Sequence, residues 1–216
     1  MLSPMSKFPE LNAHEARLLG VLFEKERTVP DQYPLSIHGL TAGANQKSNR
    51  DPVTEWSEAE VFVGLTGLIH KGLAGKVAIA GSRVEKFRHN ARETLGLDDR
   101  KLAILAELMM RGPQTVGELR ARAGRMADLA GIDAVQAELT ALLAGGMVRR
   151  LEPAPGTQAE RWMQLLAPGL HAANHGEAAA TPARAAHASG GLEERVAGLE
   201  ARIEVLERAL HELGAT

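Results

Sequence analysis

Apolar residues along the first 166 positions recur at helical spacing, and polar residues of the kind that cap helices precede the apolar stretches. In a capping box, the side chain of the N-cap residue accepts a hydrogen bond from the backbone N–H three residues later. The side chain of that later residue accepts in turn from the backbone N–H of the N-cap residue. The required spacing recurs at Asn12 and Glu15, Ser57 and Glu60, Thr115 and Glu118, and Asp133 and Gln136. Ser36 fits a further helix start, with Leu35 packing on Leu40. We predict a helix at each of these positions.

The sequence also repeats itself. The run P-L-S-I-H-G-L-T-A-G-A-N from Pro34 aligns with P-Q-T-V-G-E-L-R-A-R-A-G from Pro113, at an offset of 79 residues. Farther on, V-F-V-G-L-T-G-L-I-H-K-G-L from Val61 aligns with V-Q-A-E-L-T-A-L-L-A-G-G-M from Val135, at an offset of 74. A β-rich segment follows each copy, and in the first one Gly81 and Ser82 fit the turn of a hairpin. Each half is therefore predicted to contain three helices and then a hairpin.

Three helices followed by a hairpin is the order of elements in a winged-helix domain. The sequence thus predicts an α+β fold that is mainly helical, with one winged-helix domain at residues 1–95 and a second at 96–166. An alternative is one larger helical domain that carries two surface hairpins. Residues 167–190 are rich in alanine and broken by glycine and proline, which is typical of a flexible linker.

Three stretches of the sequence resemble the YceH family of uncharacterised bacterial proteins. They are L-N-A-H-E-A-R-L-L-G-V-L-F-E-K, N-Q-K-S-N-R-D-P-V and L-A-E-L-M-M-R-G-P-Q-T-V-G-E-L-R, and the resemblance covers about residues 9–166. The family implies tandem winged-helix domains. It supplies no established activity and no site residues.

The C-terminal segment, residues 191–213, has apolar residues at alternating spacings of four and three, which is a heptad pattern. These residues are Leu192, Val196, Leu199, Ile203, Leu206, Leu210 and Leu213. A parallel pairing would place Arg195 near Glu200 and Arg202 near Glu207 of a second chain, whereas an antiparallel pairing would oppose like charges. We predict a coiled-coil helix that makes a homodimer. The alternative is an amphipathic helix that packs on its own domain.

The composition excludes several classes of protein. The chain has no cysteine, which excludes disulfides and thiolate chemistry and fits a cytoplasmic protein. No apolar run is long enough to cross a membrane, and no sequence motif of a known catalytic class is present. His171 and His175 have a spacing that can bind metal on a helix, but they lie in the predicted linker without a third ligand. We therefore expect no enzyme activity, no cofactor and no metal.

DNA binding is the usual function of a winged helix, but the third helices do not suit base readout. Readout in the major groove uses Arg, Lys, Asn or Gln near the start of the helix. Apart from Gln136, neither third helix offers one, and Glu58 and Glu60 would face phosphates. Apolar and small residues such as Phe62 and Val63 suit contact with protein better.

The loop between the second and third helices of the first half holds five more residues than its counterpart in the second half. We expect Asn45 to end the second helix in the left-handed conformation, which leaves a surplus from Gln46 to Arg50 that is rich in hydrogen-bond donors. One interpretation is a loop that bonds its own backbone. The others are contact with nucleic-acid phosphates, or with a partner protein or small anion.

Two functions follow as expectations. The first is a non-enzymatic, regulator-like protein that binds DNA phosphates weakly, without reading bases. Its contact residues would be Gln46, Lys47, Asn49, Arg50, Lys76, Arg83, Lys86 and Arg88. The second is a protein-interaction or dimerisation module that uses the outer faces of the third helices.

Overall fold

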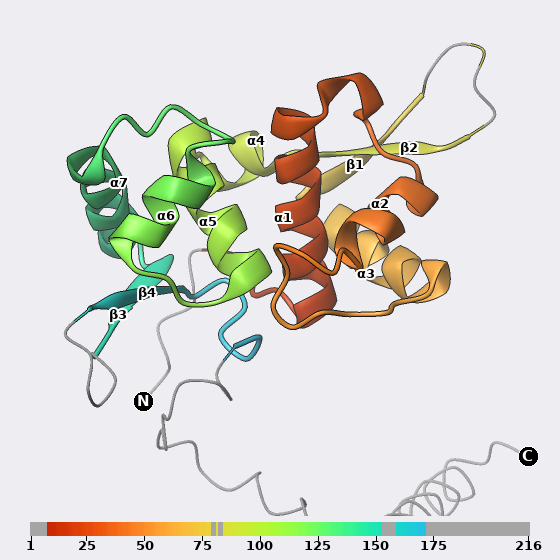
Figure 1. The fold of residues 1–216 in the computed structure, drawn as a ribbon. Helices are drawn as coiled ribbons and strands as arrows, with labels where there is room; N and C mark the ends of the chain where they lie inside the picture. Colours follow the sequence, from red (N-terminus) through yellow and green to blue (C-terminus); the bar gives the residue numbers. More distant parts are fainter. Residues whose placement is uncertain (1–7, 79–80, 82–83, 153–158, 172–216) are drawn as a thin grey trace, which may run out of the picture. The chain divides into compact units, whose positions relative to one another are not determined.

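The computed structural model describes residues 8–78, 81, 84–152 and 159–171 (Figure 1). The described part is α+β and mainly helical, with two separate two-stranded antiparallel sheets. Arg83 and the whole predicted coiled coil lie outside these residues. The first half contains α1 (Ala13–Thr28), a 3-10 turn (Pro30–Gln32), α2 (Ile37–Ala44), α3 (Glu58–His70), β1 (Ala74–Val77), β2 (Lys86–His89) and the short α4 (Ala91–Leu95) at its end. The second half contains α5 (Asp99–Arg111), α6 (Val116–Ala123), α7 (Ile132–Ala144), β3 (Val148–Leu151) and β4 (Arg161–Gln164).

The internal repeat is confirmed element by element. Helices α2 and α6 have the same length at the predicted offset of 79, and α3 and α7 have the same length at the offset of 74. Each hairpin also makes an isolated β-bridge with the residue that precedes the N-cap of the second helix of its half. Leu35 exchanges two backbone hydrogen bonds with Phe87, and Gln114 does the same with Trp162, at 2.8 and 3.1 Å in each pair. The two halves thus share a topology that the sequence patterns predict.

The helix starts confirm most of the predicted caps. Full capping boxes form at Asn12, Ser57 and Thr115, and the side chain of Ser36 accepts from the N–H of Gly39. The prediction at Asp133 is wrong, because α7 begins at Ile132, two residues earlier than a cap at Asp133 would require. The N-cap residue Gly131 has the extended backbone conformation that a helix start requires, but it has no side chain that could accept a hydrogen bond from the first turn.

Helix α1 packs along α5, and this contact joins the two halves (Figure 1). Gly20 permits the close approach, since a Cβ at this position would stand 2.9 Å from Cγ of Met110 and 3.2 Å from the carbonyl oxygen of Ala106. The buried residues of both halves form one continuous apolar cluster, made mainly of leucine and alanine. The described residues therefore belong to one compact unit, in which two similar halves share a core.

Gly43 on α2 packs against α1, and it provides a test of this packing. A Cβ at Gly43 would stand 2.6 Å from Cγ1 of Val21, which is fully buried. We expect Gly43→Ala to lower the free energy of unfolding by about 1–3 kcal/mol, because the added methyl overpacks the core. Gly117→Ala in α6 is the matched control, since a Cβ there meets nothing within 4 Å. Urea denaturation of both variants checks this prediction, and equal stabilities would contradict it.

Candidate nucleic-acid interface and interaction surfaces

The loop from Asn45 to Trp56 is closed by the side chain of Asn45. Its amide donates to the carbonyl of Trp56 at 2.7 Å and accepts from the N–H of Trp56 at 2.9 Å. Asn45 itself has a φ of −88°, so the expected left-handed helix end is wrong at this residue. The left-handed conformation occurs instead at Asn49, with a φ of 63°. The polar side chain of Asn45 is therefore used to hold the loop, while Asn49 makes the turn.

The middle of this loop contacts the second half of the protein. The N–H of Asp51 donates to the carbonyl of Met110 on α5 at 2.8 Å, and Nε2 of His171 lies 2.8 Å from the carbonyl oxygen of Asp51. Arg17 of α1 donates to the carbonyl of Pro52 at 2.8 Å. His171 is buried, so the packed body extends into the segment predicted to be linker. The loop thus contacts the second half through Asp51, directly after the extra residues.

Arg50 lies in the interior and is held from all sides. Its side chain is 0% exposed, and its guanidinium donates to Oε2 of Glu24 at 2.6 Å and to Oε1 of Gln46 at 2.9 Å. It also donates to the carbonyls of Gly43 at 3.0 Å and of Asn49 at 2.8 Å. Gln46 and Arg50 therefore do not have the expected role of contacting an anion. The Arg50 guanidinium is buried, and the side-chain oxygen of Gln46 accepts from it.

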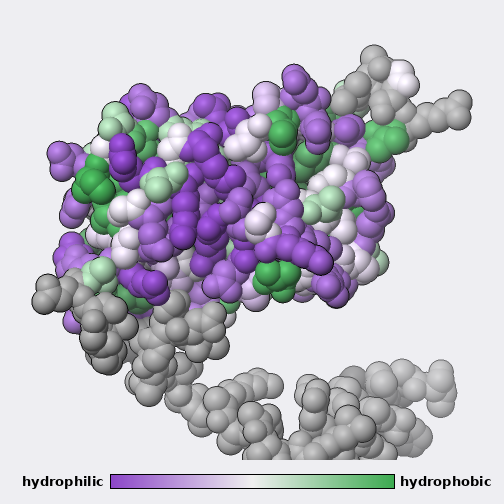
Figure 2. Space-filling model, viewed as in Figure 1, coloured by the Kyte–Doolittle hydropathy of each residue, from purple (hydrophilic) through white to green (hydrophobic). Residues whose placement is uncertain are grey.

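The ion pair of Arg50 and Glu24 continues into a network across the boundary between the halves. Arg125, in the loop after α6, donates to Oε1 of Glu24 at 2.5 Å and to Oε1 of Glu107 at 2.8 Å. Burial raises the pKa of the Glu24 carboxyl, but the hydrogen bond and charge of Arg50 and the charge of Arg125 outweigh it. The pKa of Glu24 therefore lies below its ordinary value. Figure 2 shows hydrophilic residues gathered over this boundary between α1 and α6.

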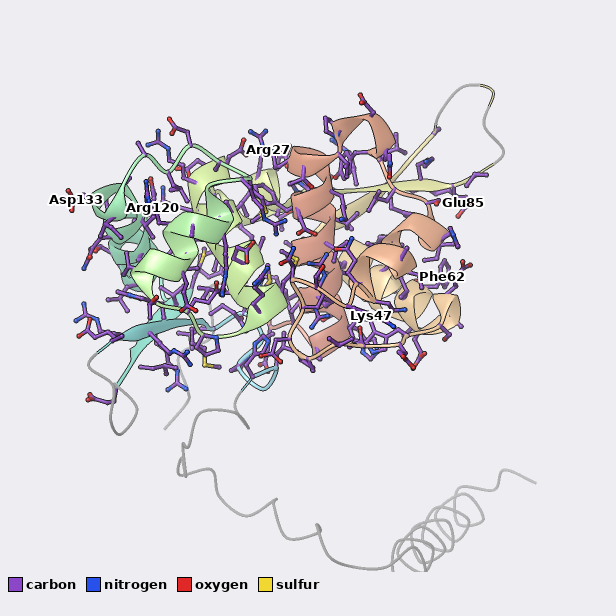
Figure 3. The ribbon with its side chains drawn as sticks, in the orientation of Figure 1. Arg27, Lys47, Phe62, Glu85, Arg120 and Asp133 are labelled. Atoms are coloured by element: carbon purple, nitrogen blue, oxygen red, sulfur yellow. The ribbon has the colours of Figure 1, made fainter. Side chains whose placement is uncertain are left out.

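Lys47, in contrast, projects from the loop into solvent (Figure 3). It is separated from Arg50 by only two residues, yet it is exposed where Arg50 is buried. Asn49 is half-buried at the turn. Of the four loop residues expected to contact an anion, Lys47 is the one whose charge is presented to solvent.

The first hairpin, β1–β2, separates its cations between two faces. Phe87 and His89 are buried against the helices, and Lys76 lies on the same side of the hairpin, where it pairs with Glu85. Lys86 and Arg88 alternate with the buried residues and therefore lie on the opposite, outward face. Their cross-strand neighbours are Val77 and Gly75, so no carboxylate stands directly opposite them. Lys76 is offset by an acid, whereas Lys86 and Arg88 leave a positive surface.

The outer side of α3 is apolar and exposed. Phe62 is 53% exposed and Val63 72% exposed (Figure 3 labels Phe62). Beside them lies a groove of about 300 Å³ lined by Asn12, His14, Ala59, Glu60, Val63 and Gly64. Glu58 and Glu60, at the start of α3, are exposed as well. A helix start of this kind repels phosphates, whereas the apolar side chains that follow it favour contact with apolar surface.

The equivalent surface of α7 is more polar. The repeat offset places Gln136 and Ala137 at the positions of Phe62 and Val63, and both are exposed. Ile132 and Leu143, at the two ends of α7, are exposed apolar residues. The exposed apolar pair in the middle of the third helix is therefore specific to the first half.

A second polar cluster, missed by the sequence analysis, joins α1, β2 and α4–α5. Nδ1 of His89 accepts from the N–H of Ala91 at 3.2 Å, so the ring proton is on Nε2, which lies 3.1 Å from Glu26. Arg92 donates to Glu26 at 2.5 Å and to Asp99 at 2.5 Å. Partial burial raises the pKa of Glu26, but the hydrogen bonds from His89 and Arg92 outweigh it and lower the pKa to about 2. The charged side chains of this cluster pair with one another, so we interpret the cluster as structural: it joins α1, β2, α4 and α5.

The side chains that could in principle bind a metal ion are scattered over the described residues. Within residues 8–171, apart from the undescribed gaps, no three His, Asp or Glu side chains gather in a way that could hold a metal ion. Of the helices that the structure describes, none has the length and apolar character needed to cross a bilayer.

Comparison with known proteins places the chain in a family. The family model described as "Protein of unknown function, DUF480" matches residues 11–157. The chain belongs to this family. It is 43% identical over 207 residues to a "UPF0502 protein" of Dechloromonas aromatica (strain RCB), with 94% of this chain and 96% of the relative covered. It is 41% identical over 209 residues to a "UPF0502 protein" of Acidovorax sp. (strain JS42), with 94% and 92% covered. The resemblance to the YceH family is thereby confirmed.

Another relative matches a shorter stretch more strongly. A "UPF0502 protein" of Geotalea uraniireducens (strain Rf4) is 50% identical over 155 residues, which is 71% of this chain and 70% of the relative. The family model ends at residue 157. The region that the family model matches includes both α2–α3 and α6–α7, and therefore the loop that connects the halves.

Proposed function

We propose that this protein is a non-enzymatic, cytoplasmic, tandem winged-helix protein that binds the phosphate backbone of nucleic acid and does not read bases. The winged-helix part of the proposal is supported by the repeated order of three helices and a hairpin. It is also supported by the isolated β-bridge that Leu35 and Gln114 each form with a hairpin. Fold alone is a weak guide to function, so the surface residues carry the argument.

The observation that carries the proposal is the outward face of the first hairpin. Lys86 and Arg88 stand two residues apart on one side of β2, and their cross-strand neighbours are uncharged. Cations at this spacing fit successive contacts with phosphate oxygens, which give affinity without sequence information. Arg88 is exposed and Lys86 is half-buried. Lys47 adds a further exposed cation from the loop.

The start of α3 explains why bases would not be read. Glu58 and Glu60 are exposed in the first turn, and Glu60 is held there by the capping box with Ser57. A helix with these carboxylates at its start is repelled by the phosphates that border a groove. The first hairpin would therefore contact the nucleic acid while α3 stays outside the groove.

The test is the affinity for random-sequence duplex DNA across a salt series. We expect Arg88→Glu to weaken binding about tenfold at about 50 mM salt, and the added change Lys86→Glu to weaken it further. The salt slope should fall by about 1 for each cation that no longer neutralises a phosphate. Lys76→Glu is the matched control, because it makes the same charge change on the opposite face of the same hairpin. The proposal fails if the native protein does not bind at low salt, or if Lys76→Glu costs as much affinity as Arg88→Glu.

A second candidate function is protein interaction through α3. The specific observation that favours it is the exposure of Phe62 and Val63 beside an apolar groove. The two candidates use different surfaces, so both can hold for the same protein.

A further inference from the structure

The outer stripe of α3 consists of Ala59, Val63, Thr66 and His70. These positions are spaced by four, three and four residues, so they lie on one line along the helix. They point away from Val61, Leu65 and Leu68, which are fully buried in the core. Ala59, Val63 and His70 are exposed and Thr66 is half-buried. Phe62 and Ile69 flank the stripe and are exposed. A helix that is apolar on both its inner and its outer side is typical of one that is buried on both sides.

The stripe is symmetric about its own centre. If a second α3 is laid across it in the opposite direction, Ala59 of one helix meets His70 of the other, and Val63 meets Thr66. The small Ala59 leaves room for the longer His70, and Val63 and Thr66 are of similar size, so the two surfaces can pack closely. The same surface on both partners is what a two-fold symmetric interface requires.

Charge favours the antiparallel direction. Glu58 and Glu60 are exposed at the start of α3, and His70 is exposed at its end. An antiparallel pair keeps the carboxylates of the two helix starts apart, and it places the two helix dipoles in opposite directions, which is favourable. A parallel pair would instead place the carboxylates of both helices side by side.

We propose that the outer face of α3 binds the same face of a second copy of this chain, with the two α3 helices antiparallel across a two-fold axis. One pair of helices of 13 residues buries less surface than the roughly 800 Å² per partner of a stable interface. The heptad pattern at residues 191–213 would supply the remaining affinity, because a coiled coil that holds two chains together raises the effective concentration of their α3 faces. This inference is independent of nucleic-acid binding.

The chain has no cysteine, which makes disulfide cross-linking a direct test. Positions 59 and 70 are 11 residues apart, or about 16 Å along the helix, which is too far for a bond within one chain. A disulfide needs Cα atoms within about 7 Å. The full-length variant that carries both Ala59→Cys and His70→Cys should therefore cross-link only between chains, whereas each single variant should give at least about tenfold less cross-linked dimer.

A second substitution connects the cross-link to the stripe. Adding Val63→Glu to the double-cysteine variant should reduce cross-linking to the level of the single variants. Ala137→Glu, at the equivalent exposed position of α7, should leave it unchanged. The proposal is overturned if the double variant cross-links no more than the single variants, or if the single variants cross-link efficiently with themselves, as parallel helices would. It is also overturned if Val63→Glu has no more effect than Ala137→Glu.

Discussion

Replacing Glu24 by glutamine is expected to lower the free energy of unfolding by about 3–5 kcal/mol, which is the usual cost of leaving one partner of a buried ion pair without the other. Glu24 accepts from Arg50 and from Arg125, and the Arg50 side chain has no exposure to water. Glutamine keeps the size of the side chain but loses its charge, so the buried guanidinium of Arg50 would remain charged without a carboxylate. The same change also releases Arg125 and so weakens the packing between the halves.

Urea denaturation of the full chain measures this effect. Glu160→Gln is the matched control, since Glu160 pairs with Arg150 at a site where both side chains are half exposed, and exposed pairs contribute at most about 1 kcal/mol. Combining Glu24→Gln with Arg50→Met should cost less than the sum of the two single changes, because the double variant buries no unpaired charge. A Glu24→Gln variant as stable as Glu160→Gln would show that the network does not hold the halves together.

The local structure was accessible from the sequence because its causes are local. Capping boxes span three residues and helical faces span seven, so Asn12, Ser57 and Thr115 predict their helices without help from the rest of the chain. The repeat offsets of 79 and 74 predicted the order of elements in both halves. Helix α4 and the 3-10 turn were not predicted, since five and three residues are too few for a periodic pattern.

The structure of the loop could not be predicted from local patterns of this kind. Lys47 and Arg50 have the same charge in the same short segment, yet one is exposed and the other is buried. The difference comes from Glu24, 26 residues before Arg50, and from Arg125, 101 residues after Glu24. Nothing within the loop specifies these partners, because they are brought together by the packing of α1 on α5. The extra length of the loop was visible in the sequence, but the contact of Asp51 with the second half was not.

The two proposed surfaces are compatible in one assembly. The outer face of α3 and the outward face of β2 belong to different elements, so a dimer formed through α3 would keep Lys86 and Arg88 exposed on both copies. Two hairpins on one dimer would double the number of phosphate contacts, and the salt dependence of binding would steepen accordingly. Use of α3 for dimerisation would also explain why its first turn carries carboxylates instead of the donors that base readout needs.

Stability is expected to fall by about 3 kcal/mol as the pH falls from about 5 to about 2, because Glu26 must become protonated in the folded protein. The folded-state pKa of Glu26 is about 2, against an ordinary value of 4.5. A carboxyl whose pKa is lowered on folding stabilises the protein above its unfolded pKa, and this contribution is lost as the pH falls through its folded pKa. Its partners His89 and Arg92 join the end of the first hairpin to α1. Protonation of Glu26 should therefore weaken the attachment of β2 to α1.

Glu26→Gln should remove this part of the pH dependence. We expect the variant to lose about 3 kcal/mol of stability at pH 7 and to show a correspondingly shallower decline between pH 5 and pH 2. Glu93→Gln, an exposed carboxyl on the adjacent α4, serves as the control, and its pH profile should follow that of the native chain. The measurement is urea denaturation at a series of pH values. If Glu26→Gln and the native chain lose stability in parallel below pH 5, the acid sensitivity comes from other carboxyls, of which Glu24 is the first to test because its pKa is also lowered.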